Sequence, residues 1–313
     1  MGYHPRIECK KMATFQTTRS RNSELWFVNN NDLTSAILGY AAKYSNRYGV
    51  KLYAFSIEGN HIQFPAHFPK CNRSSFLRDF NSSVARAIPR YQRNYPGGTF
   101  WARRYSAEYL PGRDDIEEQF FYTVLQPVKD GLVDDIKDCP WYNCFEDAIK
   151  GIERQFKTVK WKEYNDAKRW NPDVKIRDYI EIQTLKFERL PGYKKYSTAN
   201  YIKLMREKLK ERTRCLVESR LGTPCLGREK LLRIKPGSLP LNTKTSTRYD
   251  HRPRVLSVDN ERRAKGKAWY FSIYFDYKKA SQLYRKGHLN VKFPKGTYKP
   301  PLFTVCREGT IVD

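Results

Sequence analysis

The stretch Tyr53-Ala54-Phe55-Ser56-Ile57-Glu58-Gly59-Asn60-His61-Ile62-Gln63-Phe64 decides the fold of this chain. Its apolar residues alternate with small or polar ones up to Ile57, which is the periodicity of a half-buried strand. Glu58-Gly59-Asn60 predicts a tight turn, because Gly and Asn tolerate the backbone angles of a reversal. A second strand begins at His61, and its alternation places His61 and Gln63 on one face and Ile62 on the other.

Two polar side chains on one strand face could bind a divalent cation. His61 offers an imidazole nitrogen and Gln63 an amide oxygen, a donor set that suits Mg²⁺ or Mn²⁺. The alternative for such a pair on its own is a surface His and Gln that flank a core Ile. A second motif is needed to choose between the two interpretations.

That second motif is Tyr122-Thr123-Val124-Leu125-Gln126-Pro127. The run from Asp114 to Leu125 predicts a short helix that Asp114 or Asp115 caps and Pro127 ends. Tyr122 and Gln126 are four residues apart, so they share one helical face. A phenol can attack a phosphate, and a nearby amide can join a metal shell. The alternative is a buried aromatic, because Phe120, Phe121 and Tyr122 are consecutive.

Together the two motifs resemble the HUH single-strand DNA endonucleases, specifically the single-tyrosine transposases and the REP-associated tyrosine transposases. The resemblance covers residues 1–145. It rests on the Asn60-His61 lead-in, on the Tyr-x-x-x-Gln form of Tyr122 to Gln126, and on the following Val128-Lys129-Asp130-Gly131-Leu132-Val133.

The resemblance implies a DNA transposase or nickase. Tyr122 would form a covalent 5′-phosphotyrosine on single-stranded or hairpin DNA, with His61, Gln63 and Gln126 binding Mg²⁺ or Mn²⁺. It also implies a homodimer, since strand exchange by family members with one tyrosine needs two nucleophiles. The chain departs from the family at Gln63, where a second His is expected. A domesticated DNA-binding protein without chemistry is therefore the second hypothesis, and a basic RNA-associated factor is the third.

Charge is the strongest compositional signal. The 59 Lys and Arg exceed the 33 Asp and Glu, which gives a net charge of +26. The first 150 residues carry 20 basic and 16 acidic side chains, whereas the remainder carry 39 and 17. This imbalance predicts a polyanionic partner but does not say which one.

A predicted helix over 74–93 presents basic residues with aromatic rings between them. Arginines over phosphates and rings under unstacked bases are what a groove for single-stranded DNA uses; the alternative is an ordinary solvated face. The residues predicted to bind nucleic acid here and in the segment that follows are Arg73, Arg78, Arg86, Arg90, Tyr91, Arg93, Arg103 and Arg104.

The element order predicts an α+β fold, with an antiparallel ferredoxin-like sheet and helices packed on one side. We expect strands over 12–19, 51–57, 61–64 and 99–109, and helices over 32–48, 74–93, 114–125, 147–160, 201–221 and 262–286. Pro65 is expected to break its strand, which leaves His67 out of the metal shell, and Glu58 is a secondary candidate. Residues 161–198 are expected to be irregular or partly helical.

The expected segments are an HUH-type domain over 1–145, a basic helical extension over 146–226, a linker over 227–253 and a C-terminal helix and tail over 254–313. The tail is expected to pack on the core or bind DNA. The seven cysteines lack Cys-x-x-Cys spacing, so we expect structural thiols. No apolar run approaches the roughly 20 residues of a membrane span, and no apolar signal core opens the chain, which predicts a cytoplasmic protein.

Overall fold

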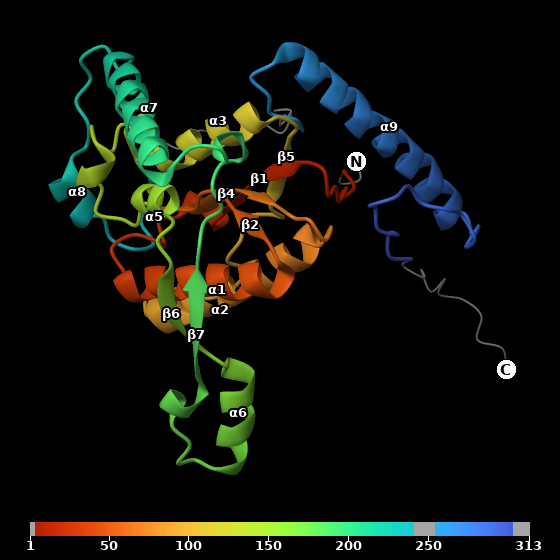
Figure 1. Ribbon diagram of the computed structural model, residues 1–313. Helices are drawn as coiled ribbons and strands as arrows, with labels where there is room; N and C mark the ends of the chain where they lie inside the picture. Colours follow the sequence, from red (N-terminus) through yellow and green to blue (C-terminus); the bar gives the residue numbers. More distant parts are fainter. Residues whose placement is uncertain (1–3, 241–253, 303–313) are drawn as a thin grey trace.

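A five-stranded antiparallel sheet forms the centre of the computed structural model, which describes residues 4–240 and 254–302 (Figure 1). The hydrogen-bonded order is β2-β4-β1-β5, and β3 also pairs with β4. This is the predicted ferredoxin-like arrangement. The strands are β1 (Ala13–Arg19), β2 (Lys51–Leu52), β3 (Ser56–Glu58), β4 (His61–His67) and β5 (Ser106–Leu110).

Helices α1 (Asn31–Tyr48) and α2 (Arg73–Tyr91) cover one face of the sheet (Figure 1). The Asn30 side chain accepts a hydrogen bond from the Leu33 amide at the start of α1, and Gly49 ends it in the left-handed conformation with φ of 65°. Phe64 of β4 stacks on Phe55 and meets Phe76 and Phe80 of α2 edge to face. The alternation of β4 therefore points His61 and Gln63 to the opposite face.

Pro65 does not break β4, contrary to the sequence prediction. β4 pairs with β1 through residue 66 and with β2 through His67. Pro65 lies opposite the gap between β2 and β3, where the neighbouring strand is interrupted, so its missing N–H costs little there. His67 shares the face of His61, but its Nε2 contacts the Lys10 carbonyl oxygen at 2.7 Å at the far end of the strand.

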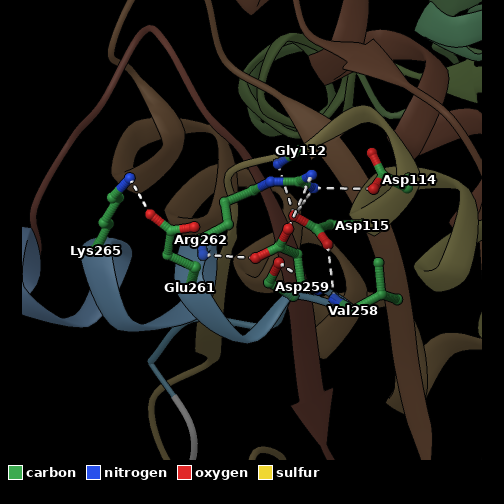
Figure 2. Close-up of polar contacts among 9 residues, drawn as sticks. Gly112, Asp114, Asp115, Val258, Asp259, Glu261, Arg262 and Lys265 are labelled. Atoms are coloured by element: carbon green, nitrogen blue, oxygen red, sulfur yellow. Dashed lines mark hydrogen bonds and ion pairs between the residues drawn. The ribbon is translucent and has the colours of Figure 1, made fainter.

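Helix α3 (Arg113–Val124) crosses the opposite face of the sheet, as predicted for the Tyr122 helix. Asp115 fastens its start by accepting hydrogen bonds from the amides of Gly112 at 2.6 Å and Val258 at 2.9 Å (Figure 2). Pro127 does not end the helical structure directly. The chain breaks at Leu125 and makes one more short helix, α4 (Gln126–Lys129), where Pro127 sits in the first turn and needs no N–H partner.

Residues 146–226 differ from the predicted helical extension. The expected helix over 147–160 is instead α5 (Phe145–Lys150), a left-handed Gly151, and strand β6 (Arg154–Val159). β6 pairs with β7 (Ile180–Leu185), and α6 (Trp161–Trp170) lies between them in sequence. Residues 161–198 are therefore partly helical, as predicted, and also contain a strand that was not predicted. Figure 1 shows this hairpin crossing α1 and projecting from the body. We call residues 154–185 the arm.

Three further α-helices follow in the described chain: α7 (Thr198–Glu218), α8 (Arg228–Leu232) and α9 (Asn260–Arg285). Short 3-10 turns occur at Arg21–Ser23, Ile136–Asp138, Ile176–Tyr179 and Pro191–Tyr193. The described helices include none long and apolar enough to traverse a bilayer. The six cysteines in the described ranges are free thiols.

The predicted linker is wrong over its first half. Residues 228–232 form α8, and the Leu25 amide donates to the Ser238 carbonyl at 2.8 Å, which seats Gly237 against Trp26. Residues 241–253 of that linker lie outside the described residues. The described part of the tail contacts the N-terminal segment, because the Glu8 amide donates to the Gly296 carbonyl at 2.8 Å. The strand expected over 99–109 is only Ser106–Leu110.

Candidate catalytic site

The strand register places the predicted metal residues in a polar row on the α3 face. Glu58 of β3 pairs with His61 of β4, and His61 pairs with Arg19 of β1. Gln63 occupies the next row. Tyr122 approaches the same face, with its ring edge to face with Phe15 of β1 at a centroid distance of 5.6 Å. Two stretches about sixty residues apart in sequence therefore meet over one sheet face.

The buried His61 imidazole is neutral at physiological pH. Burial lowers its pKa to about 3, the Arg19 charge acts in the same direction, and a hydrogen bond to Gln63 opposes them. Its Nδ1 lies 2.8 Å from Asn60 Oδ1. An amide oxygen can only accept, so the contact with Asn60 favours the tautomer with the proton on Nδ1.

Glu58, which the sequence indicated only as a secondary candidate, lies directly beside His61 in the site. The two-residue turn Gly59-Asn60 brings it opposite His61. Burial raises the pKa of Glu58 to about 7; a hydrogen bond from Ser56 opposes the shift and the Asp130 charge adds to it. A carboxylate that is half ionised near neutral pH can accept a proton or, once ionised, bind a cation.

Tyr122 is half-buried, and Lys129 Nζ lies 4.0 Å from its ring centroid. Its pKa is raised, chiefly by burial and then by the Asp130 charge, while Arg19 acts in the opposite direction. The phenol is therefore protonated at neutral pH, and it would have to lose that proton to act as a nucleophile. Asp130, Glu108 and Glu58 are the carboxylates whose charges act on the Tyr122 phenol.

Gln126 and Asp130 complete this side of the site. The Gln126 amide nitrogen donates to Asp130 Oδ2 at 2.8 Å, and its buried Oε1 has no hydrogen-bond partner among the described residues. Gln126 lies in α4 and Tyr122 in α3, so they are not on one continuous helical face. Asp130 instead links them, since it bonds Gln126 and its charge acts on Tyr122 and Glu58. Sequence reasoning missed Asp130; its signal is the i, i+4 spacing from Gln126.

The donor set fits a hard divalent cation. It comprises the neutral imidazole of His61, the Glu58 carboxylate and the orphaned Oε1 of Gln126, with the amide of Gln63 beside His61. Within residues 4–240 and 254–302, no three His, Cys, Asp or Glu side chains gather as a metal site. A cation here would therefore depend on amide oxygens, which suit Mg²⁺ or Mn²⁺ better than zinc.

The predicted nucleic-acid-binding residues lie in different parts of the molecule. Arg73 is wrong for that role: it is 3% exposed, donates to the Ile7 carbonyl at 2.8 Å and packs on Tyr109. Its burial follows from its position at the start of α2, beneath residues 7 and 8. Arg78 is exposed and bonds its neighbour Asp79 at 2.8 Å.

The other predicted basic residues are exposed, but only some lie near Tyr122. Arg86 and Arg90 project from α2, on the face of the sheet opposite Tyr122, with the half-buried Tyr91 and exposed Arg93 at the end of that helix. Arg103 and Arg104 follow Ala102, whose amide donates to the Arg19 carbonyl at 3.0 Å. Arg103 is therefore near the end of β1 that carries the polar row, whereas the Arg104 guanidinium donates to the His4 carbonyl at 2.9 Å.

Comparison with known proteins agrees with the resemblance that the motifs predict. Residues 18–118 match the family described as "Transposase IS200 like". The match includes His61 and Gln63 and ends before Tyr122. One solved structure with similarity is described as "Structure of the REP associates tyrosine transposase bound to a REP hairpin"; it is 18% identical, with a TM-score of 0.40, and covers 47% of this chain and 84% of that one. No curated protein matches the chain.

Proposed function

We propose that this protein is a single-tyrosine DNA transposase or nickase that cleaves single-stranded or hairpin DNA. The observation that carries the proposal is the meeting of Tyr122 with the His61 row on one face of a ferredoxin-like sheet. The family match over residues 18–118 supports the same class. The large positive charge suits a DNA partner.

In the proposed reaction, the Tyr122 phenolic oxygen attacks a backbone phosphorus and loses its proton to Asp130 or Glu58. A bond from phosphorus to tyrosine forms, and the bond to the 3′ oxygen breaks. The 3′ end leaves as a hydroxyl once it takes a proton, and the other strand end remains as a 5′-phosphotyrosine. Mg²⁺ or Mn²⁺, bound by His61, Glu58, Gln63 and Gln126, would supply charge stabilisation at the phosphate.

We propose further that the protein works as a homodimer in the cytoplasm. Re-joining two strand ends needs two tyrosines, and each chain supplies one at this site. The basic residues after 150 would hold a hairpin stem or flanking strand through its phosphates.

A test of the proposed function is incubation of the protein with Mn²⁺ and labelled DNA hairpins, followed by a denaturing gel. We expect a covalent protein–DNA band that Tyr122→Phe abolishes. Tyr142→Phe is a matched control, since Tyr142 lies outside the polar row and bonds Asp147. Absence of any Tyr122-dependent band across single-stranded and hairpin substrates would contradict the proposal.

A second candidate is a DNA-binding protein of the same fold without chemistry. Gln63 favours it, because a neutral amide is a weaker metal ligand than the imidazole expected there. Salt-sensitive binding that is equal for the native protein and Tyr122→Phe, with no adduct, would favour this candidate.

A further inference from the structure

A pocket of about 250 Å³ lies on the face of the molecule opposite Tyr122, where the arm crosses α1 and α2. It is smaller than the roughly 300–1,000 Å³ of sites for drug-sized ligands. Its size suits one small unit with a ring and a charged group. The side chains that line it come from α1, α2 and the arm, and the principal ones are Tyr40, Tyr44, Arg47, Arg86, Arg90, Trp161 and Lys162.

The aromatic wall of the pocket is held in place. Trp161, the first residue of α6, is half-buried, and the Arg90 guanidinium carbon lies 4.0 Å from its ring centroid. Tyr40 is hydrogen-bonded to Trp161. Tyr44 is fixed by a 2.8 Å hydrogen bond with Ser83. These contacts join the arm to both helices, so the pocket exists before any ligand binds.

The pocket also has an excess of positive charge. Six Lys and Arg side chains line it, against Glu163 and Glu181. Glu181 is neutralised by Lys43 and Lys160, each at 3.1 Å. Within the described ranges, no ion pair joins Arg86, Arg90 or Lys162 to a carboxylate. Three cations are therefore available to an anionic ligand.

We infer that this pocket binds one nucleotide unit of single-stranded DNA. Arg86 and Lys162 would hold the phosphate, and the base would stack against Trp161, because an aromatic ring beside guanidinium groups is how proteins hold unstacked bases. The pocket lies across the sheet from Tyr122, so it serves a strand outside the cleavage site. The inference rests on the proposed function only for its choice of DNA as partner.

The test measures binding of a labelled twelve-nucleotide thymidine oligomer to the full-length chain carrying Tyr122→Phe, by fluorescence anisotropy. We expect Trp161→Leu to weaken binding about tenfold and Trp161→Phe to restore most of the affinity. Arg86→Ala should weaken binding severalfold and reduce the salt slope by about 1. Arg113→Ala is the matched control, because it removes the same charge from an exposed position outside the pocket.

Equal losses for Arg86→Ala and Arg113→Ala, or unchanged binding by Trp161→Leu, would overturn the inference. Trp161→Phe and a thermal melt of each variant separate a binding loss from unfolding. Thymidine monophosphate tests the other source of the same chemistry: if it binds and the oligomer does not displace it, a free nucleotide is the ligand and the strand assignment is wrong.

The pocket and the proposed function can fail separately. A Tyr122-dependent adduct with no effect of Trp161→Leu on binding would refute nucleotide binding by the pocket and support the nickase function. Trp161-dependent binding without any adduct would refute the nickase function and support nucleotide binding by the pocket.

Discussion

Glu58 is the residue whose environment matters most to the site. It is 5% exposed and faces His61 across the β3–β4 pair. The sequence motif identified His61 and Gln63 because alternation along one strand is visible in the chain. Glu58 was only secondary there, since its pairing depends on how tightly Gly59-Asn60 turns. Asp130 was missed because the helical structure was expected to end at Pro127, whereas the short helix α4 follows and brings Gln126 and Asp130 together.

Glu58→Gln should change how stability depends on pH in the metal-free protein. The folded state favours protonated Glu58, so this residue's contribution to stability is complete below pH 4.5 and is lost as pH rises through about 7. The amide mimics the protonated form, so the variant should exceed the native protein by about 3 kcal/mol at pH 8 and by little at pH 4.5. Urea melts at both pH values measure this, and a constant difference would contradict it.

At the scale of elements, polar contacts from α7, α9 and Tyr193 hold α3 in place along its length. Lys208 and Tyr193 bond Glu117, and Arg212 pairs with Glu118 at 2.7 Å. At the helix start, Arg262 of α9 reaches Asp114 and Asp115 at 3.1 and 3.3 Å (Figure 2). The sequence predicted α3 from its acidic first turn, but not that α7 and α9 would hold it, because contacts so far apart in sequence leave no local periodicity.

Asp115→Asn should destabilise the protein by about 1–3 kcal/mol. Both carboxylate oxygens of Asp115 accept backbone amides, and the amide NH₂ would face one of those donors. Asp114→Asn removes a neighbouring exposed charge that also meets Arg262, and should cost under about 0.5 kcal/mol. Denaturant melts measure the free energy of unfolding of both variants. Equal losses would contradict the role of the two Asp115 hydrogen bonds in holding the start of α3.

Gly39→Ala tests how closely the arm packs on α1. Alanine is the better helix former by about 1 kcal/mol, yet a Cβ at 39 would lie 2.8 Å from Thr158 Cγ2 and 3.3 Å from Phe156 Cβ. We expect a net loss of about 1–3 kcal/mol in the free energy of unfolding. Thr158→Ser removes the obstructing methyl and should recover part of that loss in the double variant; a stabilised Gly39→Ala would contradict this packing.

At the scale of the whole molecule, one chain brings together the proposed nucleophile and the proposed metal residues. The contacts that hold α3 come from α7 and α9 of the same chain. Composition and charge predicted a polyanion partner and a basic second half. They could not predict the arm, because its two strands pair across the intervening helix α6 and also pack on α1, and such contacts do not depend on composition or charge.

A mixture of Tyr122→Phe and His61→Ala chains should therefore form no covalent adduct. Each variant lacks one half of a site that is built within a single chain, so a dimer of the two contains no complete site. The gel assay with Mn²⁺ and a hairpin substrate measures this, with each variant alone and the native protein as controls. Recovery of an adduct in the mixture would show that Tyr122 acts on a partner's metal residues.

The most direct measurement is the position of the covalent bond itself. The native protein is incubated with Mn²⁺ and a DNA hairpin, digested with nuclease and protease, and analysed by tandem mass spectrometry. We predict a nucleotide phosphate on the peptide that contains Tyr122 and on no other of the 22 tyrosines. A phosphate on a different tyrosine, or DNA that is cut without any covalent peptide, would contradict it.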